Sequence, residues 1–87
     1  MADLHLPGTL TSLFTALPRR VDVDALTVGE AIEHLDRQWP GLRDRLCEPG
    51  PLIRRHIHVY VEGERATLET QLAPRSRVDI IAAISGG

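Results

Sequence analysis

Hydrophobic and polar residues alternate in four short stretches of the chain, and this two-residue period is typical of β-strands. The stretches cover residues 3–7, 20–24, 55–62 and 77–84. The last stretch is the most apolar, because Val78 and Ile80 share one face while Ile81 and Ala83 make the other face apolar too. This pattern predicts a central strand that is covered on both faces.

One longer segment, residues 28–39, repeats its apolar residues at the spacing of an α-helix. These residues are Val28, Ile32, Leu35 and Trp39. The pair Thr27 and Glu30 forms a capping box, in which the Thr27 hydroxyl accepts from the Glu30 N–H and the Glu30 carboxylate accepts from the Thr27 N–H. Pro40 and Gly41 then end the helix.

The remaining segments are expected to be short or irregular. Helical turns are predicted at residues 9–17 and 42–46, a loop at 48–51, and an irregular segment at 66–73 whose Leu68 and Leu72 dock on the core. The order strand, strand, helix, strand, strand predicts an α+β fold of the β-grasp type. Its mixed sheet carries one main helix on one face, and the first and last strands pair in its middle.

The chain is expected to be a single β-grasp domain over residues 1–87, with residues 85–87 as a protruding, extended tail. These last residues are Ser85, Gly86 and Gly87. Glycine has no Cβ, so such a tail can enter a slot too narrow for side chains and present the α-carboxylate of Gly87. A frayed chain end is the alternative interpretation of the same residues.

Composition and charge narrow the classes of partner. All ten basic residues are arginine, and the net charge is −2, which favours neither a nucleic acid nor an anionic membrane as partner. The single cysteine excludes an internal disulfide. No stretch is long and apolar enough to span a bilayer. We therefore expect a cytoplasmic protein with no membrane and no nucleic-acid partner.

A few side chains could carry chemistry, but none forms a complete site. His56 and His58 share one strand face, yet zinc needs a third ligand, so we predict no metal site. Cys47 is expected to act as a small hydrophobic residue. Arg54 and Arg55 could dock an acidic partner or simply form a solvated rim.

Several motifs, spread over nearly the whole chain, together resemble one family. They are residues 6–7 with Leu10 and Leu13, residues 27–31 (Thr-Val-Gly-Glu-Ala), residues 39–42 (Trp-Pro-Gly-Leu), residues 59–61 (Val-Tyr-Val), residues 78–81 (Val-Asp-Ile-Ile) and the terminal Gly86-Gly87. The sequence resembles the β-grasp, ubiquitin-like sulfur carriers. That family includes the small subunit of molybdopterin synthase, the thiamin-pathway sulfur carrier and the sulfur carrier of cysteine biosynthesis.

The chain departs from the family pattern at four positions. His56 and His58 stand where an aromatic residue and an asparagine are usual, Glu62 stands at another asparagine position, and Ala82 stands where proline is frequent. These positions lie near the expected partner-facing surface, so they put the specific partner in question more than the fold.

The resemblance implies a carrier, a protein cosubstrate, and not an enzyme. An E1-like adenylyltransferase would convert the Gly87 carboxylate to an acyl-adenylate, and sulfur from a persulfide protein or sulfide would then give a thiocarboxylate. A sulfur-accepting synthase of molybdopterin, cysteine or thio-metabolite biosynthesis would use it. The chain would bind no cofactor, because ATP is consumed by the activating partner.

The resemblance also implies roles for individual residues. Gly86 and Ser85 would thread through the partner's channel, and Tyr60, Ile81 and Ala83 would contact the partner. A second interpretation is a ubiquitin-like modifier that is conjugated through Gly87 to lysines of other proteins. A third is a binding module with an inert tail.

Overall fold

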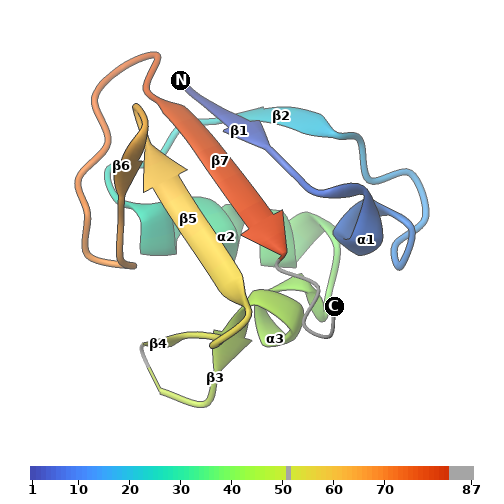
Figure 1. The fold of residues 1–87 in the computed structure, drawn as a ribbon. Coiled ribbons are helices and arrows are strands. Elements are labelled where there is room, and N and C mark those ends of the chain that lie inside the picture. The colour runs from blue at the N-terminus through green and yellow to red at the C-terminus, as the bar shows by residue number, and fades with distance from the viewer. Residues whose placement is uncertain (51, 83–87) are drawn as a thin grey trace.

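The computed structural model describes residues 1–50 and 52–82, which form one mixed sheet with the main helix across one face (Figure 1). The strands of this sheet are β1 (Ala2–His5), β2 (Arg20–Val23), β5 (Ile57–Val61), β6 (Glu64–Arg65) and β7 (Arg77–Ala82). Their spatial order is β2-β1-β7-β5-β6, with β1 parallel to β7 and the other pairs antiparallel. The predicted β-grasp arrangement, with the first and last strands paired at the centre, is confirmed.

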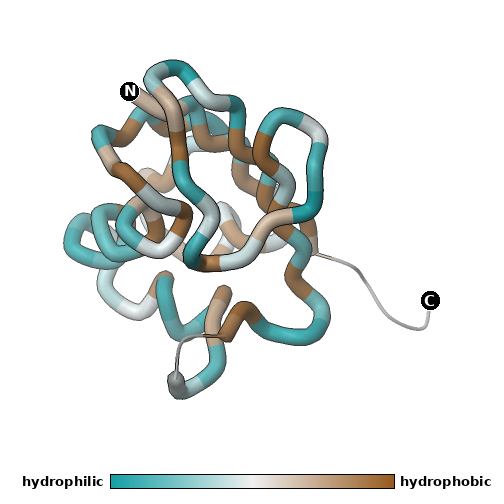
Figure 2. The backbone as a smooth tube through the Cα atoms, turned by 90° about the vertical axis from the view of Figure 1, so that its left-hand side faces the viewer, coloured by the Kyte–Doolittle hydropathy of each residue, from teal (hydrophilic) through white to brown (hydrophobic). Residues whose placement is uncertain are grey.

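Only one face of the sheet is buried. Leu4, Val59, Val78 and Ile80 belong to the buried core, together with the apolar face of the main helix. On the opposite face of β7, Asp79 is half-buried and Ile81 is 47% exposed. The prediction that the last strand is covered on both faces is therefore wrong for β7 as described, because no element of the described chain packs over Ile81. Figure 2 shows the resulting alternation of hydrophobic and hydrophilic residues along the tube.

The main helix, α2 (Val28–Gln38), begins and ends close to the predicted residues. The Thr27 hydroxyl accepts from the Glu30 N–H at 3.1 Å, as the capping box requires. The Glu30 carboxylate instead accepts from the Leu26 N–H at 3.4 Å, one residue before the predicted donor. Trp39 follows the helix as its C-cap, and its indole N–H donates to the Thr15 carbonyl at 3.1 Å.

The segment after β6 closes the N-terminus of α2. The first N–H groups of any helix lack partners within the helix. Here the Val28 N–H donates to the Thr70 carbonyl at 3.0 Å, and the Gly29 N–H donates to the Leu68 carbonyl at 2.8 Å. A Cβ at Gly29 would lie 3.1 Å from that same carbonyl oxygen, so glycine permits the close approach. Leu68 is half-buried and Leu72 is buried, which confirms that both dock on the core.

The shorter elements differ more from the expectations. The helical turn predicted within residues 9–17 is present as α1 (Gly8–Thr11). No right-handed helix could continue through Ala16, whose backbone has a φ of +63°. Helix α3 (Leu42–Leu46) matches its prediction. A hairpin of β3 (Cys47–Glu48) and β4 (Leu52–Ile53) forms where only a loop was expected. Strand β6 was also not predicted; it follows a tight turn in which Glu62 and Gly63 both have positive φ.

Candidate functional site

Strand β7 is the element that leads toward the predicted reactive end of the chain. It is paired on both sides, with β1 and with β5, and its last residue, Ala82, lies opposite Ile57. The predicted tail residues Ser85, Gly86 and Gly87, and the contact residue Ala83, lie outside the described residues. The structure therefore fixes the base of the tail through two strand ladders, and the roles of the tail residues stay predictions.

An apolar hollow of about 240 Å³ lies beside the end of β7. Its lining comes from the α1 region, α3 and two sheet strands, and consists of Pro7, Thr9, Leu10, Leu13, Arg45, Leu46, Ile57 and Ala82. Segments that are distant in the sequence meet here because α1 and α3 both pack near this end of the sheet (Figure 1). The base of the tail is thus bordered by hydrophobic side chains and one arginine.

The two described contact residues, Tyr60 and Ile81, lie on the open face of the sheet. Tyr60 is half-buried on β5 opposite Asp79, while Ile81 lies opposite His58 two residues further along the same strand pair. The sheet pairing therefore brings both residues to one surface, as expected for a shared contact face. His58, which was expected near the partner-facing surface, lies on the same face, and its ring Nδ1 is buried without a hydrogen-bond partner within residues 1–50 and 52–82.

Ion pairs surround this surface. Asp3 Oδ2 lies 2.9 Å from His5 Nε2 and 3.0 Å from an Arg20 guanidinium nitrogen. These hydrogen bonds, that of His5 first and that of Arg20 second, lower the pKa of Asp3. Arg77 pairs with Asp79 at 3.0 Å, and the hydrogen bond to Asp79 raises the pKa of Arg77. The open face therefore carries paired charges on the β1, β2 and β7 side of Tyr60 and Ile81.

Cys47 and the histidines supply no reactive centre in the described structure. Cys47 is buried, and desolvation raises the pKa of its thiol above the ordinary value, which keeps the sulfur protonated and weakly nucleophilic. Within residues 1–50 and 52–82, no three His, Cys, Asp or Glu side chains come together in a way that could hold a metal ion. The open sheet face and the end of β7 are left as the candidate site.

Among residues 1–50 and 52–82, no helix has the length and apolar character to cross a bilayer.

Comparisons with known proteins agree with the strand order and the main helix described above. A family model described as the ThiS family matches residues 7–87, whereas a comparison with curated proteins found no match. A chain in the crystal structure of the Amycolatopsis orientalis BexX/CysO complex is 25% identical with a TM-score of 0.89, and the match covers 100% of both chains. SAMP1 from Haloferax volcanii is 30% identical with a TM-score of 0.77, and the match covers 99% of this chain and 98% of that one.

A third solved structure supports the fold. CysO of Mycobacterium tuberculosis is 24% identical with a TM-score of 0.85, and the match covers 97% of this chain and 100% of that one. The family match extends from residue 7 to the terminal Gly86-Gly87 and includes every strand of the sheet except β1. The chain is a member of the ThiS family and has the β-grasp, ubiquitin-like fold of its structural neighbours.

Proposed function

We propose that the chain is a sulfur carrier whose C-terminal carboxylate, on Gly87, becomes a thiocarboxylate. The observation that carries the proposal is the combination of ThiS-family membership with a central strand, β7, that ends at Ala82, five residues before Gly87 in the sequence. A carboxylate is a poor electrophile, so the carrier needs a partner that activates it. The chain itself acts as a cosubstrate and not as a catalyst.

The proposed chemistry has two steps, both in a partner's active site. An E1-like enzyme transfers AMP from ATP to the Gly87 carboxylate and releases pyrophosphate. Sulfide then displaces AMP from the acyl carbon and gives the thiocarboxylate directly. A protein persulfide would give an acyl disulfide, which a thiol must then reduce to release the thiocarboxylate and form a disulfide with the donor protein. A sulfur-accepting synthase finally takes the sulfur from the thiocarboxylate.

The arrangement of the sheet supports the proposal that only the C-terminal residues enter the partner's active site. Strand β7 is held between β1 and β5, so Ala82 has a fixed position relative to the open sheet face. The five residues that follow Ala82 span at most about 16–18 Å when extended. An enzyme that docks on the open face around Tyr60 and Ile81 must therefore hold its reactive atoms within this extended length of Ala82.

Intact-mass spectrometry tests this proposal directly. Incubation with an E1-like enzyme, ATP and sulfide is expected to exchange one oxygen for one sulfur in the wild-type chain. A variant that lacks Gly87, and a reaction without ATP, should keep the original mass. An unchanged wild-type mass with enzymes that modify their own carriers under the same conditions would contradict the proposal.

A second candidate function is a protein modifier, and the likeness to SAMP1 favours it. Two structures of small archaeal modifier protein 1 from Haloferax volcanii are 29–30% identical to this chain over at least 95% of its length. In this case the activated Gly87 would form an isopeptide bond with a lysine of another protein. The chain contains no lysine, so lysine-linked chains of the protein itself cannot form.

Immunoblots of cells that express a tagged chain separate the two candidates. A modifier is expected to give a ladder of conjugates that disappears when Gly86 and Gly87 are deleted. A carrier is expected to give only the free protein, even when its thiocarboxylate accumulates. A ladder that survives the deletion would contradict conjugation through Gly87.

A further inference from the structure

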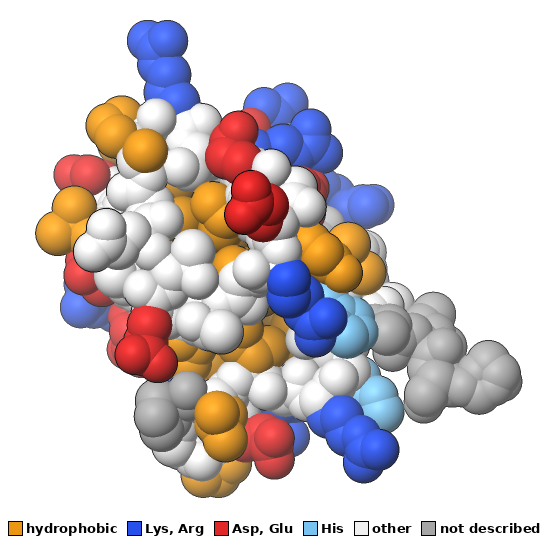
Figure 3. Space-filling model, turned by 60° about the vertical axis from the view of Figure 1, so that its left-hand side comes forward, with side chains coloured by type: hydrophobic (Ala, Val, Ile, Leu, Met, Phe, Trp, Pro, Cys, Tyr) orange, Lys and Arg blue, Asp and Glu red, His pale blue; other side chains and the backbone are white. Residues whose placement is uncertain are grey.

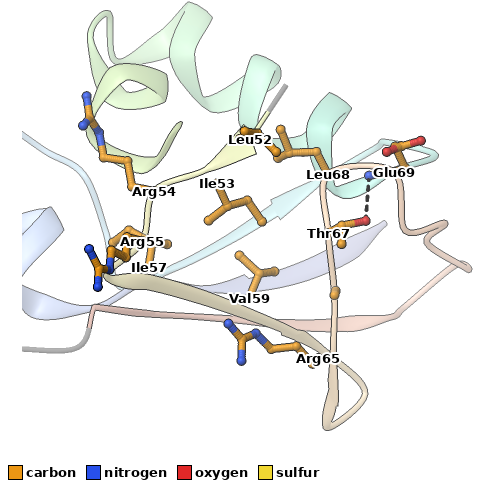
Figure 4. Close-up of a pocket in the computed structure, with 11 residues that line it drawn as sticks. Leu52, Ile53, Arg54, Arg55, Ile57, Val59, Arg65, Thr67, Leu68 and Glu69 are labelled. Carbon is orange, nitrogen blue, oxygen red and sulfur yellow. Dashed lines mark hydrogen bonds between the residues drawn. The ribbon is translucent and has the colours of Figure 1, made fainter. Parts of the chain in front are cut away.

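Two apolar hollows border the inner face of the sheet at Ile57. The larger is a groove of about 440 Å³ between the β3–β4 hairpin and the segment after β6, and Figure 3 shows hydrophobic side chains at its floor. Figure 4 shows Leu52 and Leu68 together at the border of this groove. The smaller hollow, of about 240 Å³, differs from the groove because the chain itself continues beside it, after Ala82.

The hollow beside the end of β7 is lined mainly by aliphatic side chains. Leu10 and Leu46 are buried, Ile57 is half-buried, and Leu13 is 54% exposed. An exposed leucine beside such a hollow offers apolar surface that a further side chain can cover. The shape and the chemistry of the hollow therefore fit one aliphatic side chain.

Ala82 indicates which later residue can reach the hollow. Side chains two residues apart in a strand lie on the same face. Val78 and Ile80 are buried in the core, and Ala82, the next residue on that face, lines the hollow. Ile84 follows on the same face, about 7 Å beyond Ala82 in an extended strand. Ile84 itself lies outside the described residues, although the strand pattern of the sequence extends to it.

The composition of the chain end singles out Ile84. It is the one large apolar residue after Ala82, and the others are Ala83, Ser85, Gly86 and Gly87. A side chain only two residues from the hollow is present there at a high effective concentration. Its packing therefore costs less entropy than the binding of a side chain from a separate molecule.

We propose that Ile84 packs into this hollow against Leu13 and Leu46, so that β7 continues to residue 84 and the tail begins at Ser85. Three residues then extend beyond the fold, and they span at most about 10–11 Å. The consequence for activation rests on the proposed carrier function. In that function Ile84 is a positioning residue, because it fixes how far the Gly87 carboxylate reaches from the open sheet face.

Methyl NMR spectroscopy of the full chain tests the packing. The isoleucine and leucine methyl groups are labelled, and Ile84→Val identifies the Ile84 resonance by its loss. Nuclear Overhauser effects are expected between Ile84 and the methyl groups of Leu13 and Leu46. Ile81 is the control, because it is 47% exposed on the open face and should show no such effect to either leucine.

A double-mutant cycle measures the contact through the equilibrium constant of unfolding in urea. Ile84→Ala is expected to raise this constant by about tenfold, because it removes part of a packed side chain. In a Leu13→Ala background the same change should raise it by about threefold or less, because the contact is already lost. Leu26→Ala is the matched background, since Leu26 is 70% exposed and outside the hollow, and there the tenfold effect should remain.

The positioning role has its own kinetic readout. With an E1-like enzyme that activates the wild type, Ile84→Ala is expected to lower kcat by roughly tenfold with little change in KM. The open face still docks, but more of the tail must be ordered for each reaction. Ile84→Val should restore most of kcat, and an unchanged kcat for Ile84→Ala would refute the role.

The packing is refuted if Ile84 shows no Overhauser effect to the hollow, or if its effect on unfolding is the same in both leucine backgrounds. Contacts seen only between differently labelled copies of the chain would assign the hollow to a second copy and would refute it too. A wild-type chain that no E1-like enzyme activates would refute the carrier proposal alone, because the spectra and the unfolding constants do not depend on activation.

Discussion

Replacing Leu35 by alanine is expected to lower the free energy of unfolding by about 2–5 kcal/mol. Leu35 lies on the apolar face of α2, is fully buried, and belongs to the single core between the helix and the sheet. Alanine removes the transfer free energy of the lost carbons and leaves a cavity that a close-packed core cannot fully close. At roughly 0.05–0.15 kcal/mol per residue, a domain of this size has only about 4–13 kcal/mol of stability.

Urea unfolding followed by circular dichroism measures this loss, and Leu26→Ala is its control. Leu26 is the same residue type just before the same helix, but its side chain is 70% exposed. Its replacement should change the free energy of unfolding by no more than about 0.5 kcal/mol. Equal losses from the two variants would contradict the assignment of Leu35 to the core.

The elements that the sequence predicts well are those whose signals are local. Helix α2 combines an N-terminal cap at Thr27 with an apolar stripe over several turns, and both signals lie within one short segment. Strand β5 alternates cleanly from Ile57 to Val61, so its inner and outer faces follow from the two-residue period.

Strands β3, β4 and β6 have only two residues each, which is too short for any alternation to show. Strands β3 and β4 pair with each other and β6 pairs with β5, so backbone pairing, and not a sequence pattern, defines them. The helical turn predicted within residues 9–17 is confirmed as α1, but its bounds, Gly8–Thr11, did not follow from the apolar spacing alone. Tertiary context decides such segments.

Part of the candidate site could likewise be predicted from the sequence, and part could not. Tyr60 and Ile81 share a surface because their strands pair, and the alternation in each strand already indicates their direction. The apolar outer side of β7 predicted a second covering layer, yet Ile81 is exposed. Periodicity reports that a side chain is apolar, and it does not say whether the same chain or another protein covers it.

A groove between the β3–β4 hairpin and the segment after β6 could not be predicted, because its lining comes from segments that meet only in the folded chain. Leu52 and Leu68 are separated by β5 and β6 in the sequence, and they come together across the groove. Arg54 and Arg55 left two interpretations open, a docking site or a solvated rim. In the fold, the Arg54 guanidinium donates to the Asp44 carbonyl of α3 at 2.7 Å and Arg55 is exposed, which favours the second interpretation.

Replacing Ile81 by aspartate is expected to reduce the proposed activation of Gly87 by an E1-like enzyme by about 30-fold or more, as loss of an interface hot spot worth about 2 kcal/mol would. Ile81 offers exposed apolar surface on the open face, close to the base of the tail. Aspartate would lose that contact and would have to be desolvated by the docking enzyme. It would also stand beside Asp79 on the same strand face, where Arg77 already balances one carboxylate.

The rate of ATP–pyrophosphate exchange by the activating enzyme, measured against carrier concentration, reports this effect as a change in kcat/KM. Leu26→Asp introduces the same charge at a leucine that is more exposed and lies outside the open face, so it should be activated like the wild type. Aspartate is a poor strand residue and costs up to about 1 kcal/mol of stability in a sheet, so unfolding curves of both variants must show that they remain folded. If folded Ile81→Asp is activated at the wild-type rate, the enzyme docks elsewhere, and the exposed apolar side of β7 needs another explanation.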